Sequence, residues 1–75
     1  MATLFYKDFF IIAMGRFDQK KELCMPVAGI GWHSASGHEF HSIQDSVHCC
    51  QTKQEAEAFA LEAAKAWIDA RVKAA

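Results

Sequence analysis

A chain of 75 residues has room for one hydrophobic core, so we predict a single α+β domain over residues 1–75. Its hydrophobic content of 52% excludes an intrinsically disordered chain, because disordered segments lack the apolar residues that a core requires. Eight Lys and Arg residues against nine Asp and Glu residues give a net charge of −1, which argues against a nucleic-acid partner, because phosphate contacts require a basic surface.

The longest apolar run near the N-terminus covers only residues 9–14. It is too short to span a bilayer or to form the apolar region of a signal peptide. We therefore expect a cytoplasmic protein without membrane contact. In that compartment the three cysteines, Cys24, Cys49 and Cys50, are expected to be reduced thiols.

We expect a β-meander over residues 8–50, preceded by an irregular lead-in over residues 1–7. Three stretches rich in apolar residues indicate its strands, over residues 8–17, 23–34 and 38–44. Polar residues 18–22 form a turn between the first two strands. Residues 46–50 leave room for a short fourth strand.

The loop between the second and third strands decides which residues face each other. A three-residue loop at residues 35–37, with its glycine in the left-handed conformation, places Trp32 opposite Phe40. A two-residue loop at residues 36–37 places Trp32 opposite His41 instead. We favour the three-residue loop because it buries both aromatic side chains on one face, and a slip of one residue turns every side chain to the other face.

The last predicted element is a helix over residues 52–73. Thr52 and Glu55 have the spacing of a capping box, and no Gly or Pro interrupts the residues that follow. Apolar residues form a first stripe along this helix, which we expect to cover the sheet: Ala56, Phe59, Ala60, Ala63, Trp67 and Ala70.

These elements predict a three-stranded antiparallel sheet with the helix across one face. The predicted core takes residues from both layers: Ile11 or Ile12, Ile30, Trp32, Phe40, Phe59, Ala63 and Trp67. A second stripe on the helix holds Leu61, Ile68 and Val72 and needs a cover of its own. Residues 4–6 can supply that cover, or a partner protein can, and a homodimer is the most concrete version of the second choice.

The favoured register also gathers His33, Glu39 and His41 on the face away from Trp32. Two imidazoles beside a carboxylate can bind a metal ion or act as a general base, and they are also ordinary residues for a solvated sheet face. We favour the solvated face, so we predict no catalytic residue, no metal and no cofactor. The predicted function is a non-catalytic interaction module. The alternatives are a metal-binding or His-dependent site at these three residues and a nucleic-acid-binding domain.

Two resemblances bear on these alternatives. Three antiparallel strands before a long helix resemble the core of the double-stranded-RNA-binding domain, which implies RNA binding through helices and an interstrand loop. That family has a basic cluster at its helix start, whereas TKQEAE over residues 52–57 is net acidic here. The segments TKQEA (52–56) and WID (67–69) are also similar to those of small bacterial proteins of unknown function, in which a few strands precede a helix. That second resemblance implies no activity.

Overall fold

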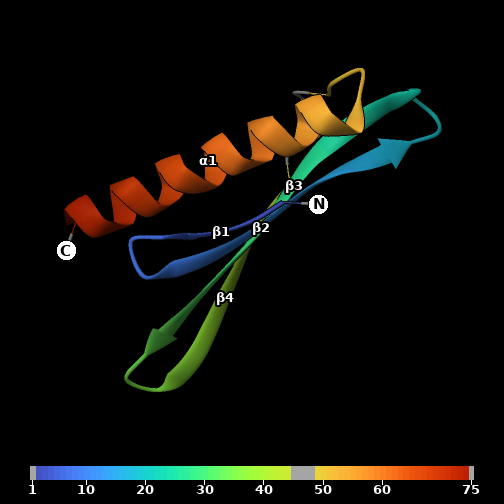
Figure 1. The fold of residues 1–75 in the computed structure, drawn as a ribbon. Coiled ribbons are helices and arrows are strands. Elements are labelled where there is room, and N and C mark those ends of the chain that lie inside the picture. The colour runs from blue at the N-terminus through green and yellow to red at the C-terminus, as the bar shows by residue number, and fades with distance from the viewer. Residues whose placement is uncertain (1, 45–48, 75) are drawn as a thin grey trace.

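The structure, a computed structural model, describes residues 2–44 and 49–74. Its elements follow the chain in the order β1 (Ala2–Tyr6), β2 (Phe9–Asp18), β3 (Leu23–Ser34), β4 (Gly37–Gln44) and α1 (Lys53–Ala74). The strands form one antiparallel sheet in the order β1-β2-β3-β4, so each strand pairs with its neighbour in the chain. Figure 1 shows α1 lying along one side of this twisted sheet, where it packs mainly on β2 and β3. The predicted α+β class, with a single helix on one sheet face, is confirmed.

The N-terminal segment is a strand, so the irregular lead-in predicted over residues 1–7 was wrong. β1 pairs with β2, and Leu4 lies opposite Ile11. The connection between the two strands is Lys7 and Asp8, which both have a positive φ, 48° and 69°. Two left-handed residues form a type I′ hairpin turn, which usually carries Asn and Gly. Because Lys-Asp gives no such signal, the sequence predicted three strands where the sheet has four.

The β3–β4 hairpin has a register that we did not predict. Its connection is the two residues 35–36, so Trp32 lies opposite Glu39, and Gly31 lies opposite Phe40. The predicted pairing of Trp32 with Phe40 was therefore wrong by one residue. Since alternate residues of a strand point to opposite faces, this shift places Phe40 on the face away from the helix, where it is 66% exposed.

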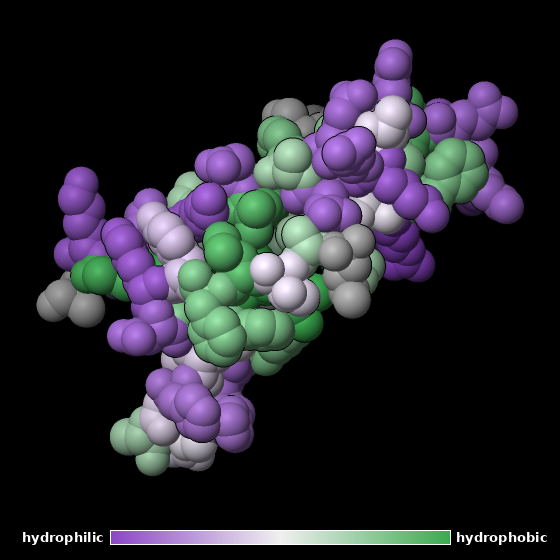
Figure 2. Space-filling view, in the orientation of Figure 1, coloured by the Kyte–Doolittle hydropathy of each residue, from purple (hydrophilic) through white to green (hydrophobic). Residues whose placement is uncertain are grey.

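The core lies between α1 and the two middle strands. Its fully buried members are small or branched aliphatic residues: Ile11, Ala13, Ala28, Ile30, Ala60, Ala64 and Ile68. Ile11 and Ile30 confirm part of the predicted core, whereas Phe59, predicted inside, is 37% exposed and Ala63 is only half-buried. The buried face of the helix is therefore rotated from the predicted stripe, of which Ala56, Ala60 and Trp67 still meet the sheet or its core. Figure 2 shows hydrophobic residues in the middle of the molecule and hydrophilic residues gathered at the tip of the β2–β3 hairpin, in the upper right.

The helix turns alanines to the sheet because the two layers meet through their backbones. A Cβ atom added to Gly15 of β2 would lie 2.6 Å from the backbone oxygen of Lys53 and 2.9 Å from the Cβ of Ala56. A large side chain such as Phe59 does not fit in a gap of that size. The helix residues that are buried follow a spacing of four: Ala56, Ala60, Ala64 and Ile68.

Specific contacts fix the two ends of α1. At its start the backbone N–H of Glu55 donates to Oγ1 of Thr52 at 3.1 Å, which confirms the predicted cap. Near its end Trp67 packs against Trp32 with ring centroids 5.6 Å apart, and the guanidinium of Arg71 lies 4.6 Å from the Trp32 ring centroid. The predicted contact between the two tryptophans is confirmed. In the part of the chain that the structure describes, no helix combines the length and the apolar character that crossing a bilayer requires.

Candidate functional site

The three residues predicted to share a polar site, His33, Glu39 and His41, do not come together. His33 lies opposite His38 on the face away from the helix, with ring centroids 4.1 Å apart. Glu39 and His41 belong to strand positions of the other parity, and His41 stacks on Trp67 with a centroid distance of 4.5 Å. The hairpin register thus separates the predicted cluster. Among residues 2–44 and 49–74, no group of three His, Cys, Asp or Glu side chains is placed to hold a metal ion.

The helix residues predicted to need a cover, Leu61, Ile68 and Val72, differ in burial. Ile68 is fully buried in the core, and Leu61 is half-buried against the same core. Val72 is 44% exposed. Ile68 lies in the core of the same chain, against which Tyr6 of β1 also packs, so residues 4–6 contribute to the cover and Ile68 does not need a second copy. Val72 is the member of this set that stays accessible to a partner.

Two of the cysteines extend the sheet beyond the end of β4. The backbone N–H of Cys24 donates to the carbonyl oxygen of Cys50 at 2.7 Å, and the N–H of Cys50 donates to the carbonyl of Cys24 at 2.7 Å. Burial raises the pKa of the Cys50 thiol, so its reactive thiolate form is less populated at neutral pH. The fourth strand predicted over residues 46–50 lies mostly outside the described residues, which resume at Cys49.

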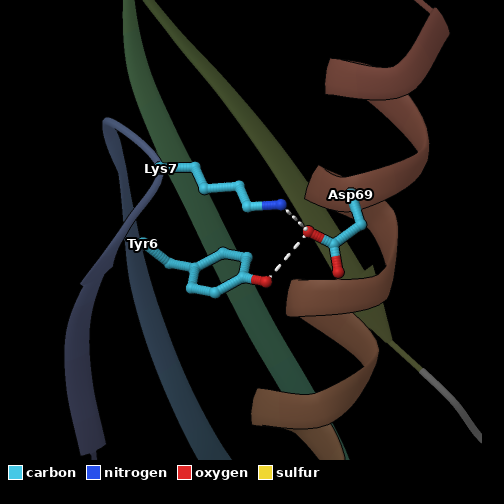
Figure 3. A network of polar contacts seen from close by, with 3 residues as sticks. All are labelled: Tyr6, Lys7 and Asp69. Carbon is cyan, nitrogen blue, oxygen red and sulfur yellow. Dashed lines mark hydrogen bonds and ion pairs between the residues drawn. The ribbon is translucent and has the colours of Figure 1, made fainter.

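A polar network joins the β1–β2 turn to the last turns of α1 (Figure 3). The hydroxyl of Tyr6 donates to Oδ1 of Asp69 at 2.9 Å, and Nζ of Lys7 donates to the same oxygen at 2.8 Å. The bond from Lys7, followed by that from Tyr6, lowers the pKa of Asp69, and the bonds to Asp69 raise the pKa of both donors. The Lys7 and Asp69 side chains are about half exposed, so this network positions the turn against the helix rather than forming a buried reactive pair.

The face of the sheet away from α1 is apolar over its central part. Its members from the four strands, read from the register, include Thr3, Phe5, Phe10, Ile12, Met14, Gly29, Gly31 and Phe40. Phe5 is 76% exposed, more than any other large hydrophobic residue of the described chain. Contiguous apolar surface of this kind usually marks an interaction site.

One row of residues across this face surrounds a hollow that we call the aromatic slot, defined by Phe5, Phe10, Gly31 and Phe40. Phe5 lies opposite Phe10, Phe10 opposite Gly31, and Gly31 opposite Phe40, so the row crosses all four strands. The rings of Phe5 and Phe10 form one wall, with centroids 5.0 Å apart and planes tilted by 60°. Gly31 lacks a side chain and provides the floor. The hollow has a volume of about 410 Å³, within the range of small-ligand sites.

The second wall of the slot depends on another glycine. The ring of Phe40 lies over the backbone of β3, because a Cβ atom added to Gly29 would come within 2.7 Å of Cζ of Phe40. Sequence reasoning missed the slot, since Gly29 and Gly31 form too short a motif to indicate a site by themselves. The usable signal is that both glycines share one strand face, where an aromatic residue on the neighbouring strand can cover the bare backbone.

The border of the slot carries imidazoles and an acidic residue. His33 and His38 lie in the next row, and Asp8 supplies the charged side chain of the lining, whereas Glu39 has the parity of Trp32 and meets the slot through its backbone. Among the described residues, none that lines the slot is Lys or Arg, and none is Ser, Thr or Cys. The slot therefore offers aromatic contact and negative charge, but no hydroxyl or thiol nucleophile beside its imidazoles. Such an arrangement is suited to binding.

No protein-family model, no curated protein and no solved structure matches this chain. The resemblances to the double-stranded-RNA-binding domain and to small bacterial proteins therefore stay predictions. A function for the chain has to be inferred from the aromatic slot and its surroundings.

Proposed function

We propose that this chain is a non-catalytic interaction module that binds its partner through the aromatic slot. The observation that carries the proposal is the row of Phe5, Phe10 and Phe40 around the bare backbone of Gly31, on a face that the helix does not cover. A folded domain gains nothing in stability from rings left in water, whereas large aromatic side chains dominate the energetics of binding surfaces.

The two other candidate surfaces support binding less well. The helix stripe predicted as a dimer interface offers mainly Val72, because Ile68 is buried within the chain. Nucleic-acid bases also stack on exposed rings, but such sites combine the rings with a basic groove that follows the phosphates. The charged side chain bordering the slot, Asp8, is acidic, and none of the described residues that line it is Lys or Arg.

The exposed rings set the scale of the expected affinity. Burying a Phe side chain completely contributes about 1.5–3 kcal/mol. Phe5 and Phe40 are 76% and 66% exposed, so covering both contributes roughly 2–4 kcal/mol before the entropic cost of binding. A small ligand that contacts only these rings is therefore expected to bind in the millimolar range, and a tighter partner needs further contacts.

Titration with the neutral hydrophobic dye Nile red tests this proposal. Its fluorescence should rise on binding to the native protein, and the rise should be lost in Phe40→Ser and in Phe5→Ser. Phe17→Ser is the matched control, because Phe17 is also an exposed ring, 51% accessible, but does not line the slot. Circular dichroism must show that each variant is folded at the titration temperature. Equal dye binding by the native protein and both slot variants would refute the proposal.

A further inference from the structure

The aromatic slot can take a small organic group above Gly31. The rings of Phe10 and Phe40 come from β2 and β4, the strands on either side of β3, and the Phe40 ring lies over the β3 backbone at Gly29. The hollow of about 410 Å³ has room for a small organic molecule that contacts the faces of these rings.

The walls favour positive charge. The face of a Phe ring carries partial negative charge and attracts cations, an attraction that aromatic cages for alkylated ammonium groups use. Phe5 and Phe10 are inclined at 60° to each other, so two ring surfaces can contact one small cation from different directions. Phe40 closes the opposite side.

The charge at the edge of the slot favours the same class of ligand. Asp8 borders the slot, and among the described residues no hydrogen bond or ion pair engages it. Lys7 adjoins Asp8 in the chain, but its ammonium group is held 2.8 Å from Asp69 on the helix. The cation nearest in sequence is thus withdrawn from the slot. Taking the proposed function as its basis, we infer that the aromatic slot binds an organic cation, an alkylated ammonium group carried by a small molecule.

The β1–β2 turn supports this assignment. Lys7 and Asp8 both have a left-handed backbone, which Asp tolerates but which is unfavourable for Lys, so Asn-Gly would form the same turn with less strain. The residues present instead put an acidic side chain next to Phe10 and send the Lys7 side chain to Asp69. The turn thus keeps the carboxylate at the slot and removes the competing ammonium group at the expense of local backbone strain.

Choline and its uncharged carbon analogue 3,3-dimethylbutan-1-ol test the inference, because they share size and shape and differ in charge. Each is titrated at constant ionic strength while the amide resonances of the protein are followed by NMR. Choline should shift the Gly31 resonance and its neighbours and bind about 3-fold to 10-fold more tightly than the alcohol. Equal binding of the two compounds overturns the inference and leaves the proposed function standing. If neither compound binds and Nile red also fails, both are refuted. If neither compound binds but Nile red does, the inference alone is refuted.

A charge-removing variant separates the role of the carboxylate from that of the rings. Asp8→Asn should weaken choline binding about 2-fold to 5-fold and leave the alcohol unaffected, and Asn tolerates the left-handed backbone at that position. Glu62→Gln is the matched control, because Glu62 is an exposed carboxylate on α1 that does not line the slot. Unchanged choline affinity in Asp8→Asn overturns the inference. Light scattering gives a second way to overturn the inference. If the protein is a dimer that Phe40→Ser dissociates and that choline does not affect, the slot binds a second copy of the chain and not an organic cation.

Discussion

Replacing Gly15 by Ala should destabilise this fold, although Ala in place of Gly often has the opposite effect. The usual gain is about 0.4–1 kcal/mol, because Ala reduces the freedom of the unfolded chain. At Gly15 the added Cβ would lie 2.6 Å from the carbonyl oxygen of Lys53 and 2.9 Å from its Cα. Both opposing atoms belong to the backbone of α1, so no side chain can rotate to make room. The start of the helix must move away from the sheet.

The size of the effect follows from two opposing contributions. Forcing an extra methyl group into a packed interior costs about 1–3 kcal/mol, and the gain in the unfolded chain offsets up to about 1 kcal/mol of that. The expected net loss is therefore about 1–2 kcal/mol. In a domain of this size each kcal/mol shifts the melting temperature by about 4–8 °C, so the variant should melt roughly 4–16 °C below the native protein.

Thermal unfolding followed by far-UV circular dichroism measures this loss, and Gly31→Ala is the matched control. The nearest atoms to a Cβ at Gly31 are 3.9 Å away, an ordinary contact distance, so that variant should melt at or above the native temperature. If Gly15→Ala melts as high as the native protein, the close packing of α1 on β2 described above is incorrect. If both variants lose the same stability, the effect belongs to glycines in strands generally and not to the helix contact.

Three further predictions concern the helix and the edge of the sheet. Asp69→Asn should lower the melting temperature at neutral pH, and the difference from the native protein should shrink as the pH falls below about 4. The reason is that a carboxyl whose folded-state pKa is lowered stabilises the fold only where it is ionised. A difference in melting temperature that persists unchanged in strong acid would contradict this. Thr52→Ala should cost about 1 kcal/mol in a denaturant titration, since it removes the helix cap, whereas Thr52→Ser should keep most of the stability. The Cys50 thiol, whose pKa is raised by burial, should react with a thiol reagent at pH 7 more slowly than a cysteine in the denatured chain. If Cys50 of the folded protein reacts faster than that, its thiol is accessible and activated.

The elements with long, regular patterns were predictable from sequence. The helix predicted over residues 52–73 is found at Lys53–Ala74, and the second predicted strand has the bounds of β3, Leu23–Ser34. Capping residues, an unbroken run of helix formers and strict alternation of side-chain faces along a strand are local signals, and they define an element without information on its tertiary packing. The same holds for the turn over residues 18–22, where polar residues separate two apolar strands.

The side-chain assignments in β4 could not be predicted, because two apolar residues of opposite parity compete for the core. The prediction placed Phe40 inside on the ground of size. In the structure Ile43 packs against the core, and Phe40 lies outside over Gly29. The aromatic slot exists because Phe40 faces away from the core, so a prediction with the wrong register could not include it. The predicted cluster of His33, Glu39 and His41 resulted from the same error in register.

The face that α1 turns to the sheet could not be predicted from the sequence either, for a different reason. Hydrophobicity favours Phe59 over Ala60 as a core residue, but the distance between helix and sheet is set by the small residues of both layers. Gly15 on β2 admits the helix backbone, and Ala60 is among the residues small enough to face it. A sequence pattern reports which residues avoid water and carries little information on how closely two backbones approach.

Because α1 follows all four strands in the chain, the protein is synthesised in an order that delays completion of its core. Hairpins with two-residue connections can close as soon as they leave the ribosome, whereas Ile11 and Ile30 have no cover until the segment around Ile68 has emerged. Until then both sides of the nascent sheet present apolar side chains to the solvent or to a chaperone. A chain that stops translating before Ile68 keeps that doubly exposed sheet and is expected to aggregate rather than to remain in solution.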